Sequence, residues 1–255
     1  MRFFEVPFNQ FKSMAVRIDA FPCTKAEFFR LIEEGYTPKH PIKFHLKYIQ
    51  DIFANYYVQE ILKHRRSQCL TVGEIGANHS RVLPCLPELS DRLYAIDVYD
   101  RSIGGGYTHK PESKEYQIIE CLIGESSELI QNHSFDILFS VSVVENVPMA
   151  IWDNFWTDQL RILKEGGTAI HLVDFYCDMI GPLPGIVDRI YKSLSVYDET
   201  FVFNQSDWAF NSSWCSNDDL TMYQWCKSAP SLSSIRRSHQ SCAMVLKISK
   251  DQGNS

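Results

Sequence analysis

The sequence contains no long apolar run and no tract of lysine or arginine. Its most apolar stretch, 135–144, carries an aspartate and two serines and is too short to span a bilayer. The N-terminus has no charged leader followed by an apolar segment, so a cytoplasmic location is expected. The formal net charge of -6 disfavours binding along a nucleic-acid backbone. We therefore expect neither a membrane nor a nucleic acid as partner.

The chain also lacks the usual spacings of zinc ligands. None of its eight cysteines forms a C-x-x-C pair, and several lie inside apolar runs, as reduced core cysteines do. Asp174 and Asp178 follow His171, but no second histidine stands at helical spacing, so no metal is expected. The dinucleotide fingerprint G-x-G-x-x-G is absent as well, because Asn78 and Arg81 replace its later glycines.

Periodicity divides the 255 residues into three zones. The first, 1–65, is rich in aromatic residues and reads as helical, with helices over 26–34 and 45–64 and Thr24 as an N-cap. The second alternates β-like and helical segments, which predicts a mostly parallel sheet with helices on its faces. Its expected strands are 69–75, 92–98, 116–121, 135–141 and 168–173, with a crossover helix over 152–163. The third is less regular, with helices over 186–194 and 219–226 and a strand over 242–248.

This organisation predicts an α/β fold, a Rossmann-like doubly wound sheet with an N-terminal helical cap. We expect residues 1–65 to form the cap or substrate lid and residues 66–255 to form the main domain. Within that domain, the aromatic segment 199–227 is a candidate lid insertion over a small, partly apolar substrate. The alternative is that these aromatic side chains belong to the core. Nothing in the sequence decides the oligomeric state, and a homodimer stays open.

The stretch Thr71–Ser80 predicts a strand, a tight turn and then a helix. Gly76 would let the backbone approach a ligand closely, and the following helix would present free N–H groups. Asp97 ends the next strand about 20 residues further on, where an acid can accept both hydroxyls of a ribose. Each feature alone is common in α/β proteins, but their order and spacing together indicate a nucleoside-binding site.

Four segments in this order resemble the class I S-adenosylmethionine-dependent methyltransferase superfamily. They are Glu-Ile-Gly-Ala from residue 74, Tyr-Ala-Ile-Asp ending at 97, the stretch 134–148, and Leu-Arg-Ile-Leu-Lys-Glu-Gly-Gly ending at 167. The resemblance covers roughly 68–175. It departs from the family pattern at Asn78 and Ser80, where later glycines of E-x-G-x-G-x-G stand, and at Asn146, where a histidine is frequent.

The resemblance implies S-adenosylmethionine as the cofactor and assigns its contacts. Glu74, Gly76, Ala77 and Asn78 would line its methionine end, Asp97 would bind the ribose, Val98 would flank the adenine, Glu125 and Ser126 would read the adenine edge, and Ser140 and Val141 would lie beside the sulfonium. The implied activity is in-line methyl transfer to a small-molecule acceptor, most simply at oxygen or nitrogen.

An acceptor hydroxyl would need a base, and His171 on the fifth strand is the first candidate, with Asp174 to orient it or to bind a substrate cation. Strand alternation places these two residues on opposite faces, and a satisfied core histidine is the alternative. His79 is a second candidate base.

Two rival functions stay open. Tyr223 and Lys227 form a Y-x-x-x-K that resembles the short-chain dehydrogenase signature, which would make the chain an NAD(P)-dependent oxidoreductase. The other rival is a non-catalytic protein that uses a methyltransferase fold for binding. Cofactor binding separates the first rival from a methyltransferase, and methyl transfer separates the second.

Overall fold

A seven-stranded sheet lies at the centre of the part of the chain that the structure describes, in the order β1-β7-β6-β5-β2-β3-β4. The structure is a computed structural model, and it describes residues 15–41, 46–65, 69–90, 92–99, 110–125, 129–178, 181–182, 185–216 and 240–251. Strands β2 to β6 pair in parallel, whereas β7 runs antiparallel to both β6 and β1. The predicted Rossmann-like, mostly parallel sheet is confirmed.

The strands are β1 (Val16–Pro22), β2 (Thr71–Ile75), β3 (Arg92–Asp97), β4 (Gln117–Glu120), β5 (Phe135–Val141), β6 (Leu163–Cys177) and β7 (Gln240–Lys250). Every residue of β5 is buried, as expected of a central parallel strand that is covered on both faces. Strand β6 begins earlier than predicted because it continues through Gly166 and Gly167, with a register shift against β5 between Phe135 and Ile137.

The helices are α1 (Lys25–Glu33), α2 (Leu46–His64), α3 (Trp152–Ile162) and α4 (Ile186–Leu194), and each confirms a predicted one. Thr24 caps α1, since its hydroxyl accepts a hydrogen bond from the Glu27 amide at 3.3 Å. Gly35 follows with a φ of 88°, a backbone conformation that favours glycine. The helix expected over 219–226 lies outside the described residues.

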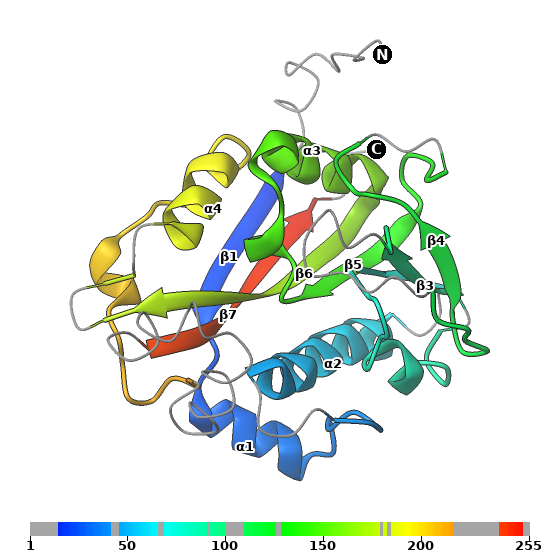
Figure 1. Cartoon of the computed structure of the whole chain (residues 1–255), viewed down its shortest axis with the longest axis horizontal. Coiled ribbons are helices and arrows are strands. Elements are labelled where there is room, and N and C mark those ends of the chain that lie inside the picture. Colours follow the sequence, from blue (N-terminus) through cyan, green and yellow to red (C-terminus); the bar gives the residue numbers. More distant parts are fainter. Residues whose placement is uncertain are drawn as a thin grey trace.

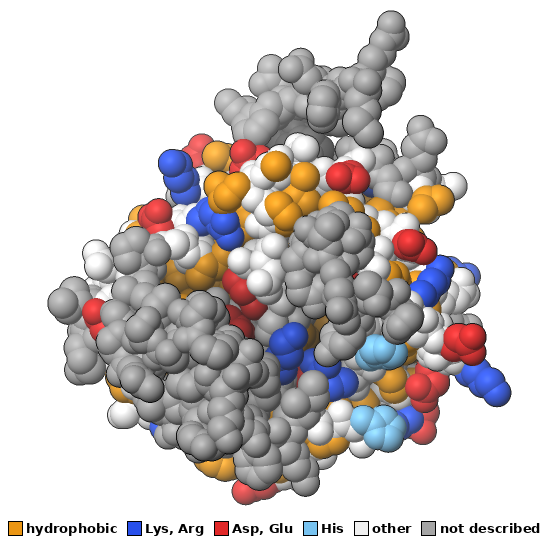
Figure 2. Space-filling view, viewed as in Figure 1, with side chains coloured by type: hydrophobic (Ala, Val, Ile, Leu, Met, Phe, Trp, Pro, Cys, Tyr) orange, Lys and Arg blue, Asp and Glu red, His pale blue; other side chains and the backbone are white. Residues whose placement is uncertain are grey.

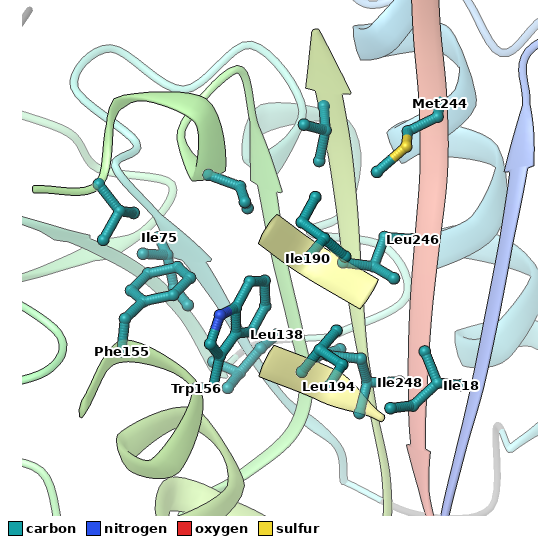
Figure 3. Close-up of a cluster of buried hydrophobic side chains, with 14 of the residues drawn as sticks. Ile18, Ile75, Leu138, Phe155, Trp156, Ile190, Leu194, Met244, Leu246 and Ile248 are labelled. Carbon is teal, nitrogen blue, oxygen red and sulfur yellow. The ribbon is translucent and has the colours of Figure 1, made fainter. Parts of the chain in front are cut away.

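The helices cover the two faces of the sheet, α2 on one and α3 and α4 on the other (Figure 1). Figure 3 shows the core on the second face, where Trp156 of α3 and Leu194 of α4 point toward Leu138, Leu246 and Ile248 of the sheet. On the first face, α2 buries its apolar residues against β5, β6 and β7. The doubly covered sheet is thus a rigid platform whose strand ends can carry a site.

One strand was not predicted. Residues 16–22 lie in the zone for which the sequence predicts helices, yet they form β1. Every residue of β1 pairs with β7. The reason is visible in the alternation of Val16, Ile18 and Ala20 with polar Arg17 and Asp19, which has the period of a strand. The prediction that residues 1–65 are helical is therefore wrong for residues 16–22, which form a strand. Whether that zone acts as a separate cap or lid stays a prediction.

The prediction of a helix directly after β2 is also wrong. Between Gly76 and Ser90 the chain forms turns and one short 3₁₀ helix, η2 (Leu83–Cys85). Pro84 and Pro87 explain the difference, because proline has no N–H and cannot continue a helical hydrogen-bond ladder. The turn after β2 therefore lacks the helix N-terminus that the sequence pattern predicts.

Two surface observations bear on partners. Among the described residues, no helix is long and apolar enough to cross a membrane. Figure 2 shows side chains of both charges interspersed on the visible face. A broad field of positive charge, which binding to a nucleic-acid backbone needs, does not occur among the described side chains of that face.

Candidate functional site

A cavity lies at the carboxyl ends of the parallel strands, the edge where open α/β sheets bind ligands. Its walls come from the ends of β2, β3 and β5, from the segments that follow β4 and β5, and from α2 and α3. The lining residues are Lys47, Ile75, Gly76, Asn78, Ile96, Asp97, Val98, Cys121, Leu122, Ile123, Val141, Ser142, Val143, Asn146, Val147, Pro148, Ile151 and Phe155. Five of the residues predicted to bind a cofactor line this cavity: Gly76, Asn78, Asp97, Val98 and Val141.

Asp97 is held at the tip of β3 by backbone amides. One carboxylate oxygen accepts from the Val98 amide at 2.7 Å and from the Tyr99 amide at 3.3 Å. The other accepts from the Asn78 amide at 2.8 Å. These bonds fix the carboxylate between β3 and the turn that follows β2. Carboxylate oxygens have further lone pairs, so Asp97 can still accept hydrogen bonds from a ligand.

The turn after β2 requires glycine at its first position. Gly76 has a φ of 65°, and a Cβ there would lie 2.4 Å from a methyl group of Val143. Asn78 follows with a φ of 43°, a conformation that asparagine tolerates better than most residues. Its Oδ1 atom is buried and has no hydrogen-bond partner. The departure of Asn78 from the family pattern therefore leaves the turn intact and adds a polar atom to the cavity.

Glu74 lies beneath this turn and does not line the cavity. The side chain is buried, and it accepts a hydrogen bond from Ser80. Burial raises the pKa of Glu74 to about 8, against the opposing effects of Ser80 and the Arg81 guanidinium. Arg81 in turn binds Asp51 of α2 through two hydrogen bonds of 2.5 and 2.9 Å. Glu74 and Arg81 thus tie the turn to the sheet and to α2.

Three other predicted contacts lie apart from the cavity. Ala77 is buried, Ser140 is fully buried, and Glu125 is exposed, and none of them is among the lining residues. Ser126 lies outside the described residues. Glu125 was expected at the adenine edge, whereas the lining includes Cys121, Leu122 and Ile123 just before it.

His171 occupies the core between β6 and α3. It has no exposed surface, its Nδ1 lies 2.8 Å from the Ser140 hydroxyl, and its ring contacts those of Phe155 and Trp156. Burial lowers the pKa of His171 to about 3. The side chain does not line the cavity, so the geometry favours the core alternative over the candidate base. A role for His171 as the base stays a prediction.

Asp174 lies on the opposite face of β6 from His171, as strand alternation predicts. Its Oδ1 accepts a 2.5 Å hydrogen bond from Gln50 of α2 and a 3.3 Å bond from Ser142. Ser142 also donates to Oε1 of Gln50 at 2.6 Å, and it lines the cavity. Direct pairing of His171 with Asp174 is therefore excluded by the sheet. His79, the second candidate base, precedes no helix that it could cap and is not among the lining residues.

The sequence patterns missed two polar lining residues, Lys47 and Ser142. Lys47 comes from α2, far from the motifs in sequence, and no periodicity marks a lysine that faces a cavity. Ser142 follows β5 directly, next to the predicted Val141, and its φ of 53° turns the chain at the strand tip. No group of three or more His, Cys, Asp or Glu side chains suited to a metal ion occurs within the described ranges.

Comparisons with known proteins agree with this geometry. Residues 73–171 match the family model of a methyltransferase domain, a span that begins in β2 and ends in β6. No curated protein matches the chain in sequence. Residues 73–171 thus match a methyltransferase domain, and the sheet that contains them has the Rossmann-like order of strands.

Solved structures give distant likenesses. Phosphoethanolamine N-methyltransferase 2 of Haemonchus contortus, solved with phosphomonomethylethanolamine and S-adenosylhomocysteine, is 14% identical with a TM-score of 0.42 over 77% of this chain. The chain spans about half (53%) of the length of that enzyme. A SAM-dependent methyltransferase from Archaeoglobus fulgidus is 10% identical with a TM-score of 0.46, covering 78% of this chain and 93% of its own.

Proposed function

We propose that the chain binds S-adenosylmethionine in the cavity and transfers its methyl group to a small-molecule acceptor at oxygen or nitrogen. The observation that carries this proposal is the distribution of charge in the lining. Among the described lining residues, the charged ones are Asp97 and Lys47. A carboxylate that accepts from ribose hydroxyls and an ammonium that pairs with the methionine carboxylate match the two polar ends of this cofactor.

The remaining lining residues fit the parts of the cofactor between those ends. Ile96, Ile123, Val147 and Phe155 offer apolar surface near Asp97 for the adenine ring. The buried Oδ1 of Asn78, which has no partner, can accept a hydrogen bond from the cofactor's amino group.

The sulfonium supplies a methyl group that is already activated for displacement. The chain's task is then to hold the acceptor in line with that methyl group and to exclude water. Asp97 and Lys47 fix the two ends of the cofactor, which fixes the direction in which the methyl group points. Ser142 and Asn146, at the tip of β5, supply polar atoms on the side of the cavity nearest β6.

The experiment that tests the proposal is a calorimetric titration of the full chain with S-adenosylhomocysteine and, separately, with NAD. We expect micromolar binding of the homocysteine compound and no binding of NAD. Micromolar NAD binding alone would instead favour the oxidoreductase, whose Tyr223 and Lys227 lie outside the described residues. If S-adenosylmethionine binds but its methyl group is never transferred to any of a broad panel of acceptors, the non-catalytic function is favoured.

A further inference from the structure

A second polar cluster lies beside the cavity, where β5 and β6 end. Gln50, Ser142 and Asp174 form a closed set of hydrogen bonds, at 2.5, 2.6 and 3.3 Å. Gln50 is thus the main donor to the Asp174 carboxylate, because Ser142 has one hydroxyl proton and its shorter contact is with Gln50. Ser142 belongs to this cluster and to the cavity lining, so the two are continuous.

Glu145 lies in the 3₁₀ turn η4 (Val144–Asn146), which follows β5 and contacts β6, the strand that carries Asp174. Its Oε2 atom is buried and has no hydrogen-bond partner. Burial, followed by the charge of Asp174, raises the pKa of Glu145, whereas the Lys47 ammonium lowers it. A buried carboxylate oxygen without a donor is costly, because such groups are normally satisfied in folded proteins.

The position of this cluster in the sheet sets it apart from the cofactor contacts. In the strand order β3-β2-β5-β6, the tips carry Asp97, Gly76, Ser142 and Asp174 in turn. A cofactor that spans Asp97 and the turn at Gly76 leaves the tips of β5 and β6 for the acceptor. Glu145 and Asp174 do not themselves line the cavity, but both are partly exposed and lie beside Asn146 and Ser142, which do.

We propose that Glu145 and Asp174 bind the amino group of the acceptor, and that the acceptor is therefore an amine. This assignment rests on the proposed methyl transfer and names its substrate class. An ammonium group has three donors and one positive charge, which match the free oxygen of Glu145 and the fixed carboxylate of Asp174.

The same pair accounts for the proton that an ammonium must lose. The Glu145 carboxylate takes one proton from the bound ammonium and becomes a carboxylic acid, which leaves a neutral amine with a lone pair. That lone pair forms the new N–C bond as the methyl C–S bond breaks, and the electrons of that bond stay on sulfur. The product is a methylated ammonium, and Glu145 later returns its proton to water.

The test uses the full chain saturated with S-adenosylhomocysteine and three matched pairs of probes: propylamine and propanol, ethanolamine and ethylene glycol, benzylamine and benzyl alcohol. Binding is measured by calorimetry for the natural sequence and for the variants Glu145→Gln, Asp174→Asn and Glu88→Gln. Glu88 is exposed and lies away from the cluster, so its variant is the matched control. We expect at least one amine to bind about tenfold or more tighter than its alcohol, and Glu145→Gln and Asp174→Asn, but not Glu88→Gln, to abolish that preference.

Three results would overturn the assignment. The first is an absence of preference for any amine in the natural sequence. The second is a preference that survives in both the Glu145→Gln and Asp174→Asn variants. The third is a loss of S-adenosylhomocysteine binding in the Glu145→Gln variant, since the carboxyl would then serve the cofactor. Failure of the natural sequence to bind S-adenosylhomocysteine is a different result, because it contradicts the proposed function itself.

Discussion

Replacing Asp97 with alanine should weaken the binding of S-adenosylhomocysteine. The Asp97 carboxylate accepts three backbone hydrogen bonds and, in the proposed complex, also accepts from the ribose hydroxyls. Alanine leaves those hydroxyls without an acceptor, which costs about 1–3 kcal/mol for buried polar groups. That cost corresponds to a rise in the dissociation constant of roughly 5- to 150-fold.

Asparagine at position 97 provides an intermediate case. It keeps one acceptor oxygen but loses the charge, so the rise in the dissociation constant should fall at the lower end of that range. Calorimetry gives the affinity, and urea unfolding of the same samples shows whether the turn at Asn78 still folds. The matched control is Asp188→Asn, because Asp188 is exposed on α4 and away from the cavity. An affinity for Asp97→Ala within twofold of the natural sequence, in a folded sample, would refute the ribose contact.

The other predictions concern four residues. Lys47→Met should raise the dissociation constant of S-adenosylhomocysteine about tenfold, and Lys47→Arg should largely restore binding. Gly76→Ala should lower stability in urea unfolding and abolish binding in calorimetry, because its φ of 65° and the 2.4 Å approach to Val143 leave no room for a Cβ. The pKa of Glu74, about 8, lies above its unfolded value, so the stability linked to it is present at low pH and is lost as pH rises toward 8. Glu74→Gln should therefore lose less stability than the natural sequence between pH 5 and 8, by a few kcal/mol at about 1.4 kcal/mol per pKa unit, in urea unfolding. His171→Ala should lower stability by about 2–4 kcal/mol and leave S-adenosylhomocysteine affinity within about threefold.

For each of these four predictions, one experimental result would contradict it. Binding by Lys47→Met as tight as in the natural sequence would remove the ammonium from the cofactor site. Tight binding by Gly76→Ala would show that the turn adapts. An identical pH dependence with and without Glu74 would mean that its carboxyl is not the titrating group. A stable His171→Ala variant with turnover reduced about 10²–10⁴-fold would make His171 the base after all.

The sheet could be read from the sequence because its central strands are short apolar runs bounded by turns. Strand β5 is the clearest case, since Phe135–Val141 is a short, mostly apolar run, and all seven of its residues are buried in the structure. Strand β1 could not be predicted in the same way, because its alternation is short and it lies close to segments with helical periodicity. Its pairing with β7 joins residues more than 200 positions apart, which no local pattern reveals.

Only part of the site could be predicted, because local sequence patterns reveal some of its residues and tertiary packing brings in the others. Gly76 and Asp97 belong to local motifs at strand ends, and such ends meet at one edge of a parallel sheet. Lys47 reaches the cavity from α2, and only the packing of that helix on the sheet brings it there. Likewise, the buried position of His171 follows from its contacts with Phe155 and Trp156 of α3, which depend on tertiary packing.

The most direct test of the proposed cofactor site is a crystal structure of the full chain with S-adenosylhomocysteine. We expect the ribose hydroxyls within hydrogen-bond distance of Asp97, the adenine against Ile123 and Phe155, and the carboxylate within reach of Lys47. An adenosyl group bound elsewhere, or one that occupies this cavity without contact to Asp97, would contradict the account.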